Sequence, residues 1–364
     1  MLKIVCVAGA RPNFMKIAPI IKAFHSGNTI DPFLVHTGQH YDEKMSDQFF
    51  RELEIPKPDV NLGIGSGSHA VQTAEIMKAF EPVCLEQQPD HVLVVGDVNS
   101  TIACGLVAVK LGIRLIHVEA GLRSGDRTMP EEINRILTDS ISDLLFCTEQ
   151  SGVDNLQKEG VPEHRIHLVG NVMIDTLLMC RAKAEESTIL DRMRLVPRQY
   201  ATMTLHRPGN VDDPAIFKGL LDAIEQIQLD MPVIFPIHPR TQKNIQTFDL
   251  EKRIMQMKNF HLVDPIGYLD FLKLNTYAYM VLTDSGGLQE ETTLLKVPCI
   301  TLRNNTERPV TCQIGTNQLV GTDPQAILEA YRKIKKDEIP ESQIPALWDG
   351  LAASRILSIL NSEV

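Results

Sequence analysis

The sequence lacks the features that mark membrane, secreted and zinc-binding chains. No apolar run approaches the roughly 20 residues that a membrane-spanning helix needs. The seven cysteines are dispersed and form no Cys-x-x-Cys pair, so we expect no disulfide framework. Residues 1–7 enter a strand pattern directly, without the features of a signal peptide. Together these absences predict a protein of a reducing compartment, the cytoplasm, without a membrane partner.

Positive charge is also in short supply. The chain has 36 Lys and Arg residues against 46 Asp and Glu residues, a formal net charge of −10. This balance argues against a general nucleic-acid-binding function and against binding to anionic membranes. A length of 364 residues and a hydrophobic content of 43% are ordinary for a globular protein with room for two domains.

Several familiar ligand and catalytic motifs are missing as well. The loop after the first expected strand is neither a dinucleotide fingerprint nor a Walker A loop. There is no Gly-x-Ser-x-Gly nucleophile elbow, and no His, Cys and Asp cluster has the spacing of metal ligands. We therefore expect acid–base chemistry on a nucleotide-linked substrate, with no bound metal.

Short β-branched runs alternate with longer helical patterns along almost the whole chain, which is typical of βαβ units in a parallel sheet. The expected strands are Lys3–Ala8, Asp31–His36, His91–Val95, Arg114–Val118, Leu144–Cys147, Ala201–Leu205, Val233–Ile237, Phe260–Val263, Met280–Leu282 and Cys299–Leu302. We predict an α/β protein with two Rossmann-like, doubly wound domains that face a cleft. The first comprises residues 1–170, joined by a C-terminal helix at 351–364, and the second comprises residues 171–350.

The most informative stretch begins at the strand Tyr279–Leu282, which runs into Ser285, Gly286 and Gly287. Glycines at such a turn let backbone N–H groups approach a ligand, and a helix N-terminus attracts phosphate. We expect the helix to open at Leu288, with Glu290 and Glu291 in its first turn. One of these acids could bind the hydroxyls of a ribose. The alternative is a tight turn whose acids only match the helix dipole.

Two cations follow the first strand, Arg11 and Lys16, and both are placed to reach over the strand ends. A pair of cations suits a diphosphate, because arginine can contact phosphate oxygens bidentately. The alternative is a surface helix start whose cations are solvated.

Three carboxylates, Asp97, Glu119 and Glu131, follow strands or open a helix in the first half of the chain. Carboxylates crowded into one cleft raise one another's pKa, which can create both an acid and a base. The alternative for Asp97 is to cap the next helix, and for Glu131 to match its dipole.

The second half places His206 with Arg207, and His238, directly after expected strands. A single histidine in such a fold is usually packed or capping. Two histidines at strand ends that face a cleft favour ligand contact.

Taken in order, these motifs resemble those of the non-hydrolysing UDP-N-acetylglucosamine 2-epimerases over essentially the whole chain. The motifs are Gly9-Ala-Arg-Pro with Lys16, Thr37-Gly-Gln-His, Gly96-Asp97, His117-Val-Glu-Ala-Gly-Leu-Arg, Pro130-Glu-Glu-Ile-Asn-Arg, His206-Arg207, Asp284-Ser-Gly-Gly-Leu-Gln-Glu-Glu and Thr306-Glu-Arg-Pro. The resemblance implies a glycosyltransferase-B-like fold, a homodimer, and a place in polysaccharide biosynthesis. It also implies reversible inversion at C2 of UDP-N-acetylglucosamine by elimination and re-addition of UDP through a glycal, without a nicotinamide cofactor.

By the same resemblance, the catalytic group comprises Asp97, Glu119, Glu131 and His206. The substrate-binding residues would be Arg11, Lys16, Arg207, His238, Phe271, Ser285, Gly286, Gly287, Glu291 and Arg308. Within this set Phe271 would line the uracil pocket and Glu291 would bind the ribose hydroxyls.

The sequence departs from the usual family pattern at Asn13, at Pro208 and Gly209, and at Arg240, near the expected sugar and phosphates. Arg240 could favour an acidic sugar, so a UDP-diacetamido-uronic acid is an alternative substrate. Tyr41 follows the Thr37-Gly-Gln-His segment where the family usually has arginine, which disfavours activation by a second UDP-sugar there. A UDP-dependent glycosyltransferase, a hydrolysing 2-epimerase and a silent nucleotide-sugar sensor are further alternatives.

Overall fold

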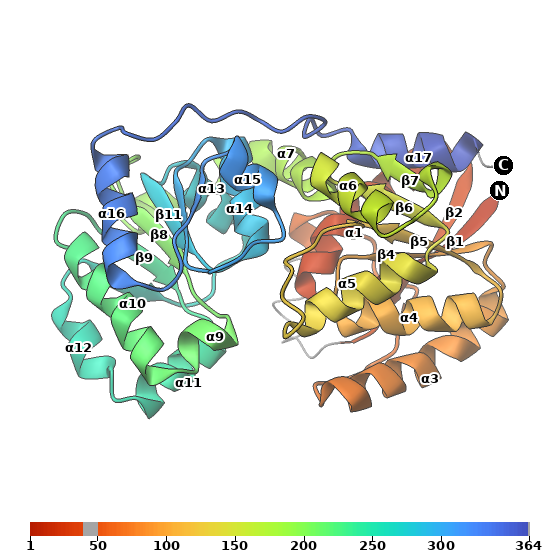
Figure 1. Ribbon diagram of the computed structural model, residues 1–364, viewed down its shortest axis with the longest axis horizontal. Helices are drawn as coiled ribbons and strands as arrows, with labels where there is room; N and C mark the ends of the chain where they lie inside the picture. Colours follow the sequence, from red (N-terminus) through yellow and green to blue (C-terminus); the bar gives the residue numbers. More distant parts are fainter. Residues whose placement is uncertain (39–49, 363–364) are drawn as a thin grey trace. The chain divides into compact units, whose positions relative to one another are not determined.

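The structure is a computed structural model that describes residues 1–38 and 50–362, apart from the side chain of Arg11. The chain forms two compact units, residues 1–179 with 346–364, and residues 180–345. Each unit contains one sheet of parallel strands flanked by helices (Figure 1). The predicted fold class of two parallel-sheet α/β domains is therefore confirmed. Gln39 and Tyr41, on which the expectation about a second UDP-sugar depends, lie outside the described residues.

The first unit is built on a seven-stranded sheet with the order β3-β2-β1-β4-β5-β6-β7. Its strands are β1 (Leu2–Ala8), β2 (Ile30–His36), β3 (Val60–Asn61), β4 (His91–Val95), β5 (Arg114–Val118), β6 (Leu144–Cys147) and β7 (Ile166–Leu168). Every residue of β4 is buried, as the apolar sequence of a strand covered on both faces requires.

The helices of this unit form layers on the sheet. They are α1 (Arg11–Gly27), α3 (His69–Gln87), α4 (Asn99–Lys110), α5 (Pro130–Ile141), α6 (Gln150–Lys158), the short 3-10 helix η1 (Glu163–Arg165), α7 (Val172–Glu185) and α17 (Ala352–Ser362). One core joins Val5 and Val94 of the sheet to Phe80 of α3 and Val107 of α4. Alternate strand residues thus serve one face, in the period of two that a pleated strand imposes.

The second unit is built on a six-stranded sheet with the order β10-β9-β8-β11-β12-β13. Its strands are β8 (Ala201–Thr204), β9 (Val233–Pro236), β10 (Phe260–Val263), β11 (Met280–Thr283), β12 (Cys299–Thr301) and β13 (Asn317–Leu319). Its helices are α8 (Ile189–Arg192), α9 (Pro208–Val211), α10 (Pro214–Ile227), α11 (Pro239–Thr247), α12 (Glu251–Gln256), α13 (Tyr268–Thr276), α14 (Gly286–Leu295), α15 (Pro309–Gln313) and α16 (Pro324–Lys335).

Two cores cover the two faces of this sheet. Ala201 and Met280 belong to the larger core, with side chains of α10, α12 and α16. Their sequence neighbours Tyr200 and Val281 belong to the other core, with side chains of α13 and α14. The alternation again follows the pleat, and it leaves the carboxyl ends of the strands to polar residues.

The start of α14 was predicted two residues too late. The helix begins at Gly286 rather than Leu288, so Glu290 and Glu291 lie in its second turn, and both are buried. They are therefore not solvated acids that match the helix dipole. The glycines, which were assigned to a loop, are themselves the first helical residues.

The chain leaves the first unit within α7 and returns to it at residue 346. The returning segment is fixed by two buried contacts. The Trp348 indole Nε1–H donates to the Thr148 carbonyl at 3.1 Å. The Asp175 carboxylate accepts from the backbone N–H groups of Ala352 and Ala353 at 3.2 and 2.8 Å, which caps the start of α17.

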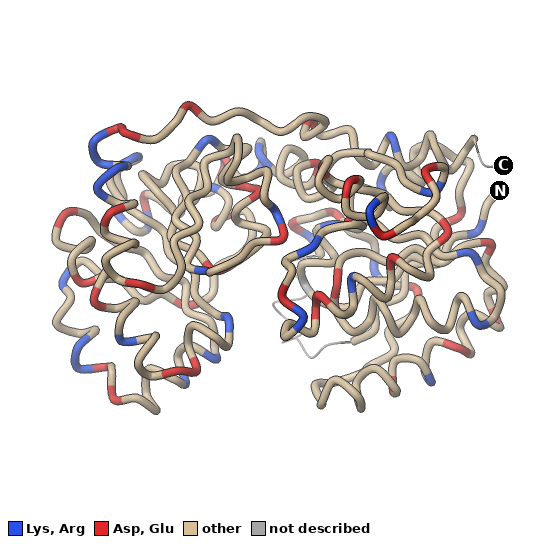
Figure 2. Tube along the Cα trace, in the orientation of Figure 1, with Lys and Arg blue, Asp and Glu red and all other residues tan. Residues whose placement is uncertain are grey.

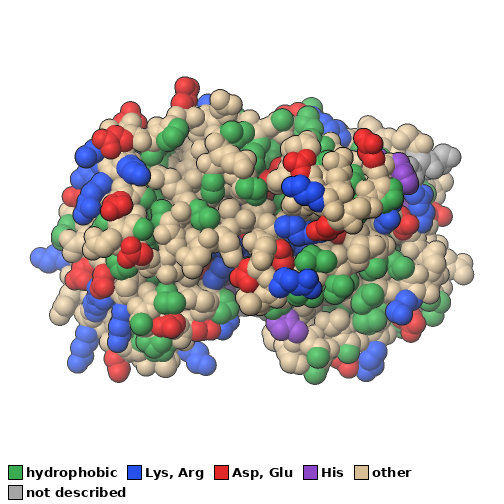
Figure 3. Space-filling view, in the orientation of Figure 1, with side chains coloured by type: hydrophobic (Ala, Val, Ile, Leu, Met, Phe, Trp, Pro, Cys, Tyr) green, Lys and Arg blue, Asp and Glu red, His purple; other side chains and the backbone are tan. Residues whose placement is uncertain are grey.

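Charged side chains are interspersed in sign along both units (Figure 2), and on the face shown in Figure 3 no basic patch dominates. The last turn of α16 is the main basic stretch of its unit, with Arg332, Lys333 and Lys335. Among the described helices, none combines the length and the apolar character that crossing a membrane requires.

Replacing Asp175 with alanine should loosen α17. The change leaves two buried N–H groups without their acceptor, and the loss of an N-cap costs about 1–2 kcal/mol. Hydrogen exchange of residues 352–362 should accelerate in Asp175→Ala. Asp323→Ala, which removes the exposed cap of α16, serves as the control and should leave exchange in α17 unchanged. Equal exchange of α17 in wild type and Asp175→Ala would contradict the capping role.

Candidate functional site

In each unit the strand order reverses between two central strands, and several of the predicted site residues follow these two strands. In the first unit these strands are β1 and β4, and in the second they are β8 and β11. Helices leave the sheet in opposite directions at such a point, so a crevice opens beyond the carboxyl ends of the strands.

The first unit holds a buried ion pair between Lys16 of α1 and Glu119, which follows β5. Their side chains are only 8% and 5% exposed. Gly96 lies against the pair, because a β-carbon there would come within 2.8 Å of Lys16 Nζ. Lys16 is therefore not a solvated cation, and its charge offsets the cost of burying the Glu119 carboxylate.

Glu119 has a backbone φ of 74°, in the left-handed region that residues with a side chain seldom adopt. Strain of this kind persists where the surroundings impose it, and it is concentrated at functional sites. The backbone N–H of Glu119 donates to the carbonyl of Phe146 at 3.0 Å, which holds the turn against β6.

Asp97 does not cap the helix that follows it. Its carboxylate accepts from Arg135 Nη1 of α5 at 2.5 Å and is 23% exposed. Arg135 also donates to Glu132 at 2.7 Å. Burial alone would raise the pKa of Glu132, but the hydrogen bond from the Ser124 N–H and the charge of Arg135 lower it. A buried cation shared by two carboxylates thus holds Asp97 in place.

Glu131 lies in the first turn of α5 and is half-buried. One turn later, Asn134 donates to the backbone carbonyl of Asp97 at 2.9 Å. The first turn of α5 is therefore tied to the end of β4. Among the described residues, no hydrogen bond or ion pair engages the Glu131 side chain. The first unit thus brings Asp97 and Glu119 to one sheet edge and places Glu131 on the helix that holds Asp97.

In the second unit Asp284 organises the loop that carries His206 and Arg207. Its fully buried carboxylate pairs with His206 Nδ1 at 2.8 Å and accepts from the backbone N–H groups of both residues at 2.9 and 2.8 Å. Burial by itself would raise the pKa of Asp284, but the hydrogen bond from His206 holds it below its ordinary value. The His206 side chain remains 42% exposed.

The start of α14 adjoins a chain of buried charges. Arg308 pairs with Glu290 at 2.7 Å and with Glu307 at 2.5 Å, and Glu307 also pairs with Arg303 at 2.8 Å. A β-carbon at Gly286 would lie 2.6 Å from Arg308 Nη1. A side chain at Gly286 would therefore displace the Arg308 guanidinium from its present position. Burial would raise the pKa of Glu307, but the neighbouring arginines hold it far below its usual range.

Arg207 connects the two parts of this region. Its Nε donates to the Asp284 carbonyl at 3.0 Å, and its Nη2 lies 3.9 Å from Glu307. Ser285 is the N-cap residue of α14, but its side chain makes no capping hydrogen bond. The N–H groups of the first turn, at Gly286 and Gly287, therefore have no partner within the helix, and Arg308 lies close to Gly286. Such a helix end combined with arginines has the charge that binds phosphate.

Glu291 differs from Glu307 in the direction of its pKa shift. Burial, together with the charge of Glu290, raises the pKa of Glu291 to about 8, although a hydrogen bond from Tyr268 lowers it. The Tyr268 hydroxyl donates to Oε1 at 3.3 Å, and Oε2 has no hydrogen-bond partner among the described residues. An unpartnered buried carboxyl oxygen can accept from the hydroxyl of a ligand.

The remaining predicted residues lie on neighbouring elements. His238 caps α11, accepts the Arg240 N–H at 3.2 Å, and has its ring centroid 5.8 Å from that of His206. Burial and the nearby His206 lower the pKa of His238. Phe271 lies half-buried on α13 and packs against the second core of its unit. Arg11 opens α1, and its side chain is outside the described part of the structure.

Arg240 was predicted to favour an acidic sugar, but its guanidinium is already engaged. Its Nε and Nη2 atoms contact the two carboxylate oxygens of Asp212 at 2.8 and 2.5 Å. This bidentate pair occupies the face of Arg240 that would bind a carboxylate ligand.

Sequence reasoning missed several residues that build these sites. They are Arg135, Glu132, Asp284, Arg303 and Glu307. Of these, Asp284 had a usable signal, since it directly follows a buried strand and precedes two glycines. The pairs of Arg135 with Glu132 and of Arg303 with Glu307 have partners three and four residues apart. The contact of Arg135 with Asp97 had no such signal, because 38 residues separate the two.

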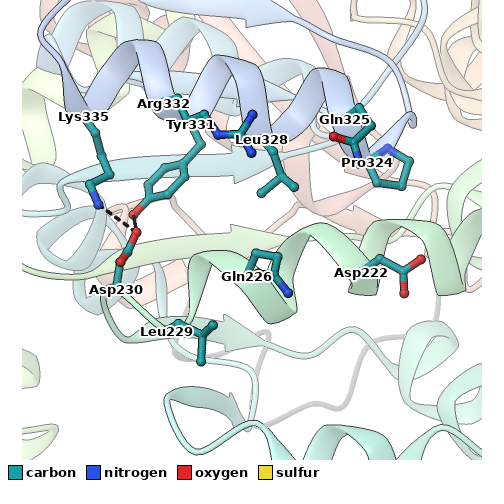
Figure 4. A pocket seen from close by; sticks show the side chains of 10 residues that line it. All are labelled: Asp222, Gln226, Leu229, Asp230, Pro324, Gln325, Leu328, Tyr331, Arg332 and Lys335. Atoms are coloured by element: carbon teal, nitrogen blue, oxygen red, sulfur yellow. Dashed lines mark hydrogen bonds and ion pairs between the residues drawn. The ribbon is translucent and has the colours of Figure 1, made fainter.

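A groove with a volume of about 650 Å³ lies elsewhere, between α10 and α16 (Figure 4). Tyr331 and Lys335 both donate to Asp230 there at 2.8 Å. None of the predicted site residues lines this groove. The described residues also contain no group of three or more His, Cys, Asp or Glu side chains arranged to hold a metal ion.

Comparison with known proteins gives a consistent result. A family model described as UDP-N-acetylglucosamine 2-epimerase matches residues 22–361. The chain is 44% identical over 341 residues to a UDP-N-acetylglucosamine 2-epimerase of Methanococcus maripaludis, covering 92% of each chain. It is 40% identical over 365 residues to the UDP-2,3-diacetamido-2,3-dideoxy-D-glucuronate 2-epimerase of Pseudomonas aeruginosa, covering 99% of each.

A solved structure also resembles this chain over almost its whole length. The crystal structure of Methanocaldococcus jannaschii UDP-GlcNAc 2-epimerase in complex with UDP-GlcNAc and UDP has a TM-score of 0.93 and 42% identity, covering 99% of this chain and 100% of that one.

The unusual protonation of Glu291 can be measured through stability. Between the ordinary value of 4.5 and about 8, the folded chain binds a proton at Glu291 that the unfolded chain has released. Stability therefore falls as pH rises through this window. Glu291→Gln keeps a neutral side chain at every pH. The difference in melting temperature between this variant and wild type should therefore increase in favour of the variant as pH rises, and it should become constant above about pH 8.

Glu329→Gln, at an exposed glutamate of α16, is the matched control and should follow the wild-type profile. Parallel profiles of Glu291→Gln and wild type would show that Glu291 titrates normally.

Proposed function

The chain belongs to the UDP-N-acetylglucosamine 2-epimerase family, and from this premise we propose that it interconverts UDP-N-acetylglucosamine and UDP-N-acetylmannosamine without hydrolysing them. The chain is an isomerase. The observation that most directly supports this chemistry is the buried Lys16–Glu119 pair beside Asp97 at the switch point of the first sheet. Inversion at a carbon requires proton transfer at two faces, and this edge supplies more than one carboxylate.

The reaction proceeds in two redox-neutral steps. A carboxylate takes the proton from C2, the C2–H electron pair forms a C1=C2 double bond, and the C1–O bond breaks to release UDP. UDP then re-forms the bond at C1, and a proton reaches C2 from the opposite face. The base and the acid are drawn from Asp97, Glu119 and Glu131. Because the sugar is neither oxidised nor reduced, the scheme requires no redox cofactor.

The second unit has the groups that a departing UDP requires. Ser285 and the N–H groups of Gly286 and Gly287, together with Arg207 and Arg308, would stabilise the negative charge of the diphosphate as the C1–O bond breaks. His206, oriented by Asp284 and still exposed, would donate to the phosphates.

The remaining roles concern the nucleoside and the first unit's cations. The free Oε2 of Glu291 would accept from a ribose hydroxyl, and Phe271 would pack on uracil. His238, beside His206, would contact the substrate. Arg11 and Lys16 would hold the sugar diphosphate from the first unit.

The family contains a second substrate class, since the Pseudomonas aeruginosa relative is named for a UDP-diacetamido-glucuronate. Arg240 would be the natural partner for that sugar's carboxylate. Its bidentate pair with Asp212 favours the uncharged sugar instead. We further propose that the protein acts as a homodimer in the cytoplasm, where it would supply an activated sugar for polysaccharide biosynthesis.

Isotope labelling tests the reaction class. With UDP-N-acetylglucosamine in deuterated water, deuterium should enter C2 of both epimers without any acceptor, as followed by NMR. A UDP-dependent glycosyltransferase would leave C2 unlabelled, and a hydrolysing epimerase would release free N-acetylmannosamine and UDP. In the same assay, the UDP-diacetamido-uronic acid should be converted more slowly than UDP-N-acetylglucosamine. The reverse order would overturn the substrate assignment.

The carboxylate roles can be separated from folding and binding. Asp97→Asn and Glu131→Gln should each lower turnover at least ~100-fold, in line with the contribution of acid–base groups, while UDP still binds. Asp90→Asn is the matched control, since Asp90 precedes the same strand at its other end and binds the Lys3 N–H. Near-normal turnover in both site variants would remove these residues from the reaction.

A further inference from the structure

His117 is a buried histidine next to the proposed site. It has no role in the reaction steps proposed above. It lies on β5, is 0% exposed, and has both ring nitrogens bonded. Nε2 lies 2.8 Å from the Gly96 carbonyl, and Nδ1 lies 2.6 Å from Asp139 Oδ1. Since a carbonyl only accepts, Nε2 carries a hydrogen and donates it. With no free nitrogen and no exposure, His117 cannot itself exchange a proton with a substrate.

The bond to Gly96 completes a two-point link between the ends of β4 and β5. In the opposite direction, the Gly96 N–H donates to the Val118 carbonyl at 3.1 Å. Gly96 immediately precedes Asp97, and Val118 immediately precedes Glu119. The link therefore fixes the separation of the two backbone segments that carry these carboxylates. Gly96 has a φ of 67°, so its carbonyl leaves the regular sheet pattern and needs another donor.

Asp139 of α5 secures the far side of Glu119. Besides His117, its buried carboxylate accepts from the Gly121 N–H at 3.0 Å and pairs with Arg123 at 2.7 Å. Burial would raise the pKa of Asp139, but the charges of His117 and Arg123 lower it. Gly121 cannot shift toward α6, because even a β-carbon there would lie 2.3 Å from the Gly152 carbonyl.

The backbone around Glu119 is thus fixed on both sides, and both contacts come from the same pair, His117 and Asp139. Gly96 is held by His117 on one side, and Gly121 is held by Asp139 on the other. Between them Glu119 keeps its left-handed backbone, a conformation that persists only where the surroundings enforce it.

We propose that His117 and Asp139 are positioning residues that hold Glu119 and Asp97 at the spacing required for proton transfer at C2. The inference rests on the proposed function, because it assumes that these carboxylates act on the sugar. A base displaced by about 1 Å can lose on the order of 100-fold in rate, so the effect falls on turnover rather than on UDP binding.

Three substitutions at one position separate the two bonds of His117. In His117→Gln the amide nitrogen can take the place of Nε2 and keep the donor to Gly96. In His117→Asn it can take the place of Nδ1 and keep only the contact with Asp139. His117→Leu keeps neither. kcat in the epimerase assay should fall roughly 100-fold in His117→Leu and His117→Asn, and by less than about tenfold in His117→Gln.

The Kd of UDP should stay within about twofold of wild type in all three variants, because most of the residues proposed to bind UDP, among them Arg207, Glu291 and Arg308, belong to the other unit. Asp139→Asn should also lower kcat without changing the Kd. His91→Leu is the matched control: His91 is a buried histidine at the amino end of β4. Its loss should lower the melting temperature without a selective loss of kcat.

The outcomes are distinguishable. The positioning role would be overturned if His117→Leu kept the kcat of wild type. It would also be overturned if kcat, UDP affinity and melting temperature all fell to the same extent in each of the three variants. If His117→Leu does not fold, the ordering of His117→Gln above His117→Asn in kcat decides the same question. A wild-type chain that puts no deuterium into C2 refutes the proposed function itself, before any variant is assayed, and the inference falls with it.

Discussion

The buried ion pair between Lys16 and Glu119 is the interaction on which the first unit's site depends. Taking two charges out of water costs several kcal/mol each, so a pair of this kind is weak evidence for stability. It also constrains its neighbours, because Gly96 must lack a side chain for Lys16 to reach the carboxylate. A site that stabilised only the fold would be better served by apolar side chains. The retained charges instead suit a carboxylate that must act at a fixed position.

In the second unit, the same residue type is driven to opposite protonation states by local surroundings. Glu307 lies among Arg303, Arg308 and Arg207, and its pKa is far below the ordinary value. Glu291 is equally buried but faces a tyrosine and another acid, and its pKa rises to about 8. Burial is common to both, so the neighbouring charge decides the outcome. Anionic Glu307 can array arginines beside a diphosphate, whereas Glu291 keeps an oxygen free for a neutral hydroxyl.

Much of this architecture could be predicted, because parallel strands place their polar successors at one edge. That rule predicted that Asp97, Glu119, His206 and Ser285 would lie at strand ends, where the structure has them, and the fold class followed from the alternating pattern. The failures have other causes. The start of α14 was misplaced because Gly286 and Gly287 open the helix although glycine is a poor helix former. Arg135 holds Asp97 from 38 residues away, and Asp212 occupies Arg240. Such long-range charge pairs leave no periodic trace in a sequence.

Two histidine–aspartate pairs, His206 with Asp284 and His117 with Asp139, have similar contacts but differ in burial. This difference gives the two histidines different roles. His206 binds Asp284 through Nδ1 and keeps a side chain that is 42% exposed, so its other nitrogen remains available to a ligand. His117 binds Asp139 through the same nitrogen, but it is fully enclosed and its second nitrogen is committed to Gly96. The aspartate in each case orients the ring. Since only the exposed ring can reach a substrate, the enclosed one can contribute only by fixing the backbone that carries Asp97 and Glu119. His206 and Asp284 both follow strands, whereas His117 lies within β5 and Asp139 within α5. The difference in exposure assigns the first pair to ligand contact and the second to structural support.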